Sequence, residues 1–253
     1  MKLRKVESSE YAKYADAGWA PSYAYPLAVI EGIQKGDIYE GGGAVLLWQY
    51  CGFAYIAGNV SEEFLDAVYE DFITAELERR FVLITDDEKI IGYLSGKPGI
   101  VTEKRFEFEH DMKSGSEQAK SAEAKNPDLR IVPVTAENIS NIKGRIIPAF
   151  SWDSNEAFLE KGLGYAAMDG ERVAAVAFSS AVCSDETDIG VETDPDYRNR
   201  GLAAGVAGKM CEAVLALGKK PIWSCAAMNI ASAKTAERIG FKNVREKTVI
   251  RKM

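Results

Sequence analysis

The chain has 253 residues, 27% charged and 47% apolar, which is typical of a globular protein with one large domain or two modest ones. Its net charge of −7 argues against general nucleic-acid binding and is compatible with a cationic amine substrate. The single histidine, His110, lies in a charged stretch and is expected to be exposed. Triad chemistry and histidine-rich metal sites are therefore disfavoured, and no metal is expected.

No apolar run approaches the ~20 residues that span a bilayer, and the polar start of the chain predicts no signal peptide. The four cysteines, Cys51, Cys183, Cys211 and Cys225, lack Cys-x-x-Cys spacing and are expected to be reduced and mostly buried. These features predict a cytoplasmic protein without a membrane or nucleic-acid partner.

The first predicted elements are two strands, over residues 45–49 and 53–57. Ser61, followed by two glutamates and a helical repeat of apolar residues, marks the start of a helix. Residues 81–85 and 90–94 are predicted to pair as strands across an acidic turn.

Residues 1–112 are thus predicted to form a small α/β domain, followed by a polar linker over residues 113–127. The aromatic residues of this domain either pack in its core or line a substrate cleft between two domains. They include Trp19, Tyr23, Tyr25, Trp48, Tyr50 and Phe53.

Residues 128–253 are predicted to form a second domain that begins with a strand over 129–134. Helices are expected within residues 135–142 and 150–161. A hairpin over residues 164–178 follows, because an Asp-Gly pair separates two apolar runs there.

A strand over residues 188–193 then leads through Gly201 into an amphipathic helix that Gly218 ends, and a further strand covers residues 220–225. The first N–H groups of a helix lack intrahelical partners, and the helix dipole places about +0.5 charge at that end. Since Gly201 has no Cβ, a phosphate could approach this backbone closely. An ordinary turn before a capped helix would give the same local pattern.

Two motifs in this region resemble those of the GNAT N-acetyltransferase superfamily, which binds acetyl-coenzyme A. The family's pyrophosphate motif, Arg or Gln-x-x-Gly-x-Gly or Ala, is matched by Arg198, Gly201 and Ala203. Its second motif, an Asn followed eleven residues later by Gly-Phe, is matched by Asn229 and residues 240–241. Both motifs occur in order, separated by a predicted helix and strand.

The resemblance covers residues 128–253 and implies an α/β (α+β) fold. A mixed, largely antiparallel central sheet would be flanked by helices, would end with a strand over 244–251, and would be accompanied by the smaller N-terminal domain. It also implies acetyl-CoA as co-substrate, with a backbone N–H near Val191 to Thr193 polarising the thioester carbonyl. The residues expected to bind it are Val191, Thr193, Arg198, Asn199, Arg200, Gly201, Leu202, Ala203, Asn229 and Ser232.

The proton-handling residues common in the family are missing. Ala236 occupies the position of a frequent Tyr, and Ser224 that of a frequent Glu, so the general acid is unassigned. Asp188 and Glu192 are the best candidates for a base, and both face one side of a regular strand unless a bulge intervenes. A solvated acidic strand edge is the alternative. Cys225 is a candidate thiol, although a buried structural cysteine is the ordinary interpretation.

These residues predict an N-acetyltransferase that moves an acetyl group from acetyl-CoA to a primary amine of a small molecule, by direct transfer in a ternary complex. A homodimer is possible for such a fold. Two alternatives stay open: an inactive acyl-CoA-binding or sensing module, and an N-acetyltransferase of proteins or peptides.

Overall fold

The computed structural model describes residues 1–19, 24–110 and 125–253. Its strands are β1 (Arg4–Lys5), β2 (Gly36–Gly41), β3 (Ala44–Gln49), β4 (Phe53–Gly58), β5 (Val82–Thr85), β6 (Ile100–His110), β7 (Arg130–Pro133), β8 (Gly164–Asp169), β9 (Arg172–Val182), β10 (Glu186–Thr193), β11 (Lys220–Ala226) and β12 (Phe241–Lys252). The α-helices are α1 (Ala24–Ile30), α2 (Glu62–Val68), α3 (Glu88–Ser95), α5 (Asn155–Lys161), α6 (Leu202–Ala216) and α7 (Ile230–Arg238). The shorter helical segments are η1 (Ser8–Tyr14), η2 (Tyr69–Ile73), η3 (Ile139–Asn141), η4 (Pro148–Phe150) and η5 (Pro195–Tyr197).

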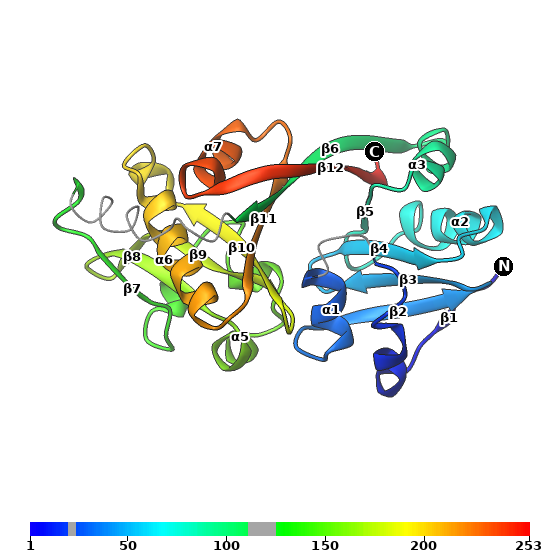
Figure 1. Ribbon diagram of the computed structural model, residues 1–253, viewed down its shortest axis with the longest axis horizontal. Helices are drawn as coiled ribbons and strands as arrows, with labels where there is room; N and C mark the ends of the chain where they lie inside the picture. Colours follow the sequence, from blue (N-terminus) through cyan, green and yellow to red (C-terminus); the bar gives the residue numbers. More distant parts are fainter. Residues whose placement is uncertain (20–23, 111–124) are drawn as a thin grey trace.

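The strands form one sheet in the order β1-β2-β3-β4-β5-β12-β6-β11-β10-β9-β8-β7. Neighbours are antiparallel except for β4–β5 and β10–β11, so the predicted mixed and largely antiparallel sheet is confirmed. Helix α6 packs on β8, β9 and β10 at one end, while α3 contacts β6 and β12 towards the other (Figure 1). Across the described ranges, no helix is both long and apolar enough to cross a bilayer.

Local signals account for several of these elements. Helix α2 begins where predicted, because the Ser61 hydroxyl accepts a hydrogen bond from the N–H of Phe64 (3.2 Å). The hairpin of β8 and β9 turns at Gly170, whose φ of 57° lies in the left-handed region that glycine adopts without strain. Helix α6 is followed by Gly218 with a φ of 73°, which ends the helix as predicted.

The predicted strand over residues 90–94 is wrong, because this segment is part of α3. The Asp87 carboxylate caps the helix by accepting hydrogen bonds from the N–H groups of Lys89 (2.8 Å) and Ile90 (3.2 Å). Ile90 and Leu94 are four residues apart and both are buried, as a helix face requires. Strand β5 pairs instead with β4 and β12.

The two helices expected early in the second domain are also shorter than predicted. Within residues 135–142 only the short segment η3 forms. Within 150–161, the regular helix α5 starts after Ser154, whose hydroxyl accepts a hydrogen bond from Ala157 N–H (3.1 Å). The first residue of α5 is therefore set by the polar capping residue, and the apolar repeat alone places the start of the helix too early.

Long-range pairing joins the two halves of the chain. Strand β6, assigned from the sequence to the N-terminal domain, lies between β11 and β12, and β12 also pairs with β5 (Figure 1). The expectation that His110 is exposed is wrong: it ends β6 inside the sheet, only 5% exposed, with Nε2 3.0 Å from the carbonyl of Ile239. Tyr23 and residues 113–124 of the predicted linker lie outside the described residues, and the division into domains stays a prediction.

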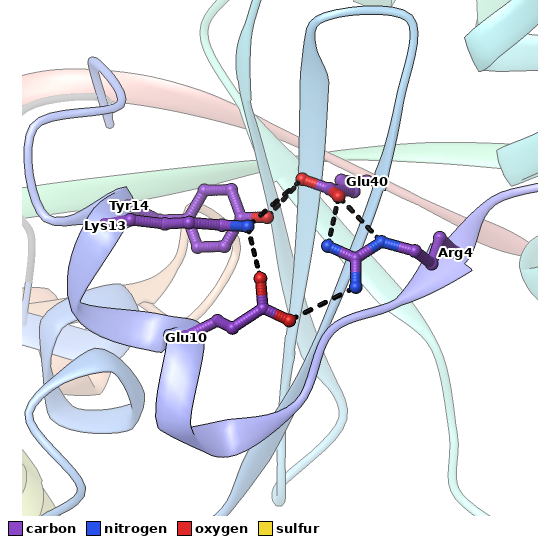
Figure 2. Close-up of polar contacts among 5 residues, drawn as sticks. All are labelled: Arg4, Glu10, Lys13, Tyr14 and Glu40. Atoms are coloured by element: carbon purple, nitrogen blue, oxygen red, sulfur yellow. Dashed lines mark hydrogen bonds and ion pairs between the residues drawn. The ribbon is translucent and has the colours of Figure 1, made fainter.

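The segment η1 is fastened to the first strands by a polar network (Figure 2). Arg4 bonds the carboxylates of both Glu10 and Glu40, Lys13 bonds Glu10, and the Tyr14 hydroxyl donates to Glu40. The ammonium of Lys13 and the guanidinium of Arg4 lower the pKa of Glu10 to about 2. The network fixes η1 to β1 and β2, and η1 also shares an apolar cluster with α1.

Candidate active site

The site forms where two neighbouring strands separate. Parallel pairing of β10 and β11 is limited to residues 186–188 opposite 220–222, although both strands continue beyond it. Strand β11 stays paired with β6, so β10 diverges from β11, and beyond Asp188 this edge of β10 has no strand partner among the described residues. A pocket of about 180 Å³, here called the splay pocket, lies at this divergence and is lined by parts of both strands, by Tyr25 of α1 and by η4.

Asp188 lies at the closed end of the splay pocket and is 4% exposed. Its carboxylate accepts hydrogen bonds from the hydroxyls of Ser224 (3.3 Å) and Tyr25 (3.4 Å). Burial raises the pKa of Asp188 to about 7, even though the positive charge of Arg105 acts in the opposite direction. A carboxyl that titrates near neutral pH in a pocket is suited to accept a proton from a substrate.

A β-bulge helps to build this environment. Asp188 pairs with Ala181 and Ile189 with Ser179, so Ser180 is an extra residue on β9. The Ser180 hydroxyl lies 2.7 Å from that of Tyr25 and so helps to fix the phenol beside the carboxylate. Because the extra residue is on β9, the alternation along β10 is preserved.

Glu192, the second candidate base, lies on the same face of β10 as Asp188, since Ile189 and Val191 pack towards α6 on the opposite face. Its carboxylate is engaged elsewhere: it accepts hydrogen bonds from the backbone N–H groups of Arg145 (3.3 Å) and Ile146 (2.9 Å). Glu192 therefore holds the loop before η4, and Asp188 is the stronger candidate for proton transfer.

The structure adds Arg105 and Tyr25 to the predicted site. Arg105 of β6 donates a hydrogen bond to the Ser224 hydroxyl (2.7 Å), so Ser224 links this guanidinium to Asp188. No local motif marks Arg105, because only the pairing of β6 with β11 brings it here. Tyr25 belongs to the aromatic group whose role the sequence left open between core and cleft.

Two other candidate positions are unsuited to a role in catalysis. Ala236 is 0% exposed and packs in the apolar core, so its position does not face the pocket. Cys225 lines the pocket, but burial raises the pKa of its thiol, which therefore stays protonated at neutral pH. All four cysteines of the chain are buried and free.

A groove of about 640 Å³ continues from the splay pocket to the start of α6, and we call it the α6 groove. The N-cap residue Gly201 has a φ of 81°, and a Cβ placed there would meet no atom within 4 Å. The first N–H groups of α6 thus face an open cradle that an anionic group can enter, as a pyrophosphate requires. The residues that line both cavities are Val191, Trp223, Asn229 and Ser232.

All but one of the predicted cofactor-binding residues line the α6 groove. Those that line it are Val191, Thr193, Arg198, Asn199, Gly201, Leu202, Ala203, Asn229 and Ser232. The exception is Arg200, which is absent from the groove lining; its guanidinium lies 5.0 Å from the Tyr197 ring centre. Lys234 and Arg238, one helical turn apart on α7, line the groove and carry no local motif in the sequence. They add two cations to the one that Arg198 supplies.

The second motif residue, Asn229, has a structural role that explains its position. Its side-chain oxygen caps α7 by accepting a hydrogen bond from the N–H of Ser232 (3.2 Å). The Ser232 hydroxyl in turn accepts one from the indole N–H of Trp223 on β11 (3.1 Å). These bonds fix the start of α7 against the strand that forms one wall of both cavities.

Residues 27–250 match the model of the GNAT acetyltransferase family, so the chain belongs to this family. The match extends well beyond the predicted residues 128–253 and includes most of the N-terminal half. Membership makes the protein an acetyltransferase by family, with acetyl-CoA the donor that the family generally uses.

Individual relatives agree with this assignment. The chain is 24% identical over 258 residues to "Uncharacterized N-acetyltransferase YdfB" of Bacillus subtilis, covering 98% of this chain and 96% of that protein. The fold is similar to that of a GCN5-related N-acetyltransferase-like protein from Streptococcus suis, with a TM-score of 0.74, 20% identity, and coverage of 98% of this chain and 100% of that one. A GCN5-related N-acetyltransferase from Kribbella flavida gives a TM-score of 0.59 at 16% identity, and the match covers 91% of this chain and 95% of that one.

Proposed function

We propose that the protein transfers an acetyl group from acetyl-CoA to the primary amine of a small molecule, directly and within a ternary complex. The observation that carries this proposal is the continuity of the two cavities. The buried carboxyl of Asp188 lies in a pocket that shares a wall with the α6 groove. An amine beside Asp188 and a thioester in the groove would therefore meet between β10 and β11.

The α6 groove fits the phosphates of the donor. The N–H groups that follow Gly201 and the guanidinium of Arg198 would hold the pyrophosphate, and Lys234 and Arg238 would meet a further phosphate. The guanidinium of Arg198 makes no hydrogen bond or ion pair with the described residues, which leaves it free for an anion. Bound acetyl-CoA supplies the activated thioester.

Asp188 takes the proton from the substrate ammonium, which frees the nitrogen lone pair for attack on the acyl carbon. A backbone N–H of β10 near Val191 would stabilise the charge that develops on the carbonyl oxygen. The C–N bond forms, the nitrogen releases its second proton to water, the C–S bond breaks, and the thiolate takes up a proton from water. Because a thiol has a pKa of about 8.5, it leaves readily without the tyrosine that Ala236 replaces.

A first prediction concerns Tyr25. In Tyr25→Phe the ring keeps its edge contact with Phe53, 5.3 Å between ring centres, but the hydrogen bond to Asp188 is lost. Because that bond stabilises the ionised carboxylate, the pKa of Asp188 should rise further. The acidic limb of the kcat/KM profile should move to higher pH, and an unchanged limb would show that Asp188 does not control it.

A second prediction concerns Arg198. Reversing its charge with Arg198→Glu should weaken acetyl-CoA binding about 10- to 100-fold, as expected when a charge-assisted bond to phosphate is lost. Arg200→Glu is the matched control: it makes the same change two residues away, where the guanidinium stacks on Tyr197 instead of lining the groove. Calorimetric titration with acetyl-CoA measures both. Equal weakening by the two variants would argue for a general charge effect instead of this binding site.

The alternative of a non-catalytic acyl-CoA-binding module is favoured by one observation: Ala236, at the motif position of a frequent tyrosine, has no proton to donate. Such a module would bind acetyl-CoA with the same dependence on Arg198 but would acetylate no amine. Release of free CoA thiol above background, in the presence of an amine, distinguishes the two functions.

A further inference from the structure

A larger cleft, of about 840 Å³, adjoins the splay pocket, and we call it the outer cleft. Residues that line both include Phe53, Arg105, Arg145 and Phe150. Within the described part of the chain, the outer cleft and the α6 groove have no lining residue in common. If the donor occupies the α6 groove, the outer cleft is the route left for the acceptor. Its volume is within the range of small-molecule sites.

The charge of the outer cleft is opposite to that of the whole chain. The net charge is −7, yet among the described residues the cleft is lined by six cationic side chains and by only two carboxylates, those of Glu78 and Glu103. The cationic residues are Arg79, Arg80, Lys104, Arg105, Arg145 and Arg251. A concave surface with one sign of charge concentrates ligands of the opposite sign.

Three of these cations are already neutralised by carboxylates. Arg79 pairs with Asp37 (2.8 Å), Lys104 pairs with Glu246 (3.0 Å), and Arg251 pairs with Glu103. The other three are Arg80, Arg105 and Arg145. Among the described residues, no carboxylate oxygen lies within 4.0 Å of their side-chain nitrogens.

Arg80 and Arg105 are held in place by neutral partners. Arg80 donates from Nε to the carbonyl of Cys51 (2.6 Å), and its guanidinium lies 5.2 Å and 5.0 Å from the ring centres of Phe53 and Phe150. The guanidinium of Arg105 lies 5.1 Å from the Phe53 ring centre. Two guanidinium groups thus contact one aromatic ring at the junction of the outer cleft and the splay pocket. Apart from its contact with Cys51, the guanidinium of Arg80 has no hydrogen-bond partner among the described residues.

Given the proposed acetyl transfer, on which this inference rests, we propose that the acceptor amine also carries an anionic group, a carboxylate or a phosphate. Arg80 and Arg105 bind this group at the junction while the amine lies at Asp188. The planar guanidinium suits both anions because it can donate two parallel hydrogen bonds.

The test uses pairs of amines that differ in the anion: phosphoethanolamine with ethanolamine, and β-alanine with its amide. The anionic member of at least one pair should have the higher kcat/KM, and the pair with the larger ratio identifies phosphate or carboxylate. Arg80→Gln should reduce that ratio about 10- to 100-fold, as expected for one charge-assisted bond, mainly through KM. Arg251→Gln, in the same cleft but paired with Glu103, should change the ratio by no more than about twofold.

The possible failures are distinguishable. If the neutral members are acetylated as efficiently as the anionic ones, the inference is overturned and the acetyl transfer stands. If no amine is acetylated although acetyl-CoA binds, the proposed transfer fails. In that case, titration of the protein–CoA complex with phosphoethanolamine and β-alanine still tests the cleft. Binding that is weakened by Arg80→Gln supports the anion site, and the absence of binding contradicts it.

Discussion

Replacing Asp188 with asparagine should lower kcat by about 10²- to 10⁴-fold, the usual contribution of a positioned general base. Asparagine has nearly the same shape and can keep a hydrogen bond with Ser224, but it cannot take a proton from the substrate. Glu192→Gln is the matched control on the same face of β10, where the carboxylate holds a loop. Its effect on kcat should be much smaller, and similar losses in both variants would argue against a specific role for Asp188.

The pH dependence tests the same residue. Since the pKa of Asp188 is raised to about 7, kcat/KM of the unaltered protein should rise with pH through this region as the carboxyl ionises. Asp188→Asn should lose this limb. If the variant kept both the limb and the rate, another group would have to be the base.

As the pH rises, the stability of the folded protein should fall while kcat/KM rises. In the unfolded chain an aspartic acid ionises near pH 4, whereas burial keeps Asp188 protonated up to about pH 7 in the folded protein. The folded state then binds more protons, so stability falls as the pH rises between these values. Asp188→Asn should lack this loss, so the difference in thermal stability between the variant and the unaltered protein should shift in favour of the variant from pH 4 to pH 8. A uniform loss of stability would indicate a packing defect.

Replacing Gly201 with leucine should weaken acetyl-CoA binding by about tenfold or more, since even one charge-assisted bond to phosphate contributes that much. The leucine side chain would occupy the open space at the start of α6, where the pyrophosphate is proposed to bind. A non-glycine residue at a φ of 81° is also strained by about 1–2 kcal/mol. The loss of affinity has to be separated from this strain.

Gly218→Leu provides that separation. Gly218 follows the opposite end of the same helix and has a φ of 73°, and a Cβ at this position would likewise meet no atom within 4 Å. Both variants should show similar losses in the free energy of unfolding, and only Gly201→Leu should lose affinity for acetyl-CoA. Equal affinities in the two variants would contradict the placement of the phosphates at the start of α6.

Local signals were enough to predict much of the second half of the chain. The helix after Gly201 and the hairpin with its Asp-Gly turn depend on neighbours in sequence, and both are present. The candidate carboxylates also lie on one face of β10, because the bulge that would have separated them is on the partner strand. Such features can be predicted from one sequence because the interactions that create them span only a few residues.

The decisive features of the site are non-local. The burial that raises the pKa of Asp188 comes from α1 and β6, which lie far from it in sequence. The same pairing of β6 brings Arg105 to the pocket and buries His110, so periodicity alone could indicate neither. The short apolar run over residues 90–94 fits either a strand or a helix, and the capping Asp87 decides in favour of the helix.

The measurement that tests the central claim most directly follows both products of one reaction. The protein is incubated with acetyl-CoA and the paired amines, and free CoA thiol and N-acetylated amine are quantified together, with Asp188→Asn in parallel. We expect the two products in equal amounts from the unaltered protein, and a strongly reduced rate from a variant that still binds acetyl-CoA. Thiol release without acetylated amine, or equal rates from both proteins, would contradict transfer at the splay pocket.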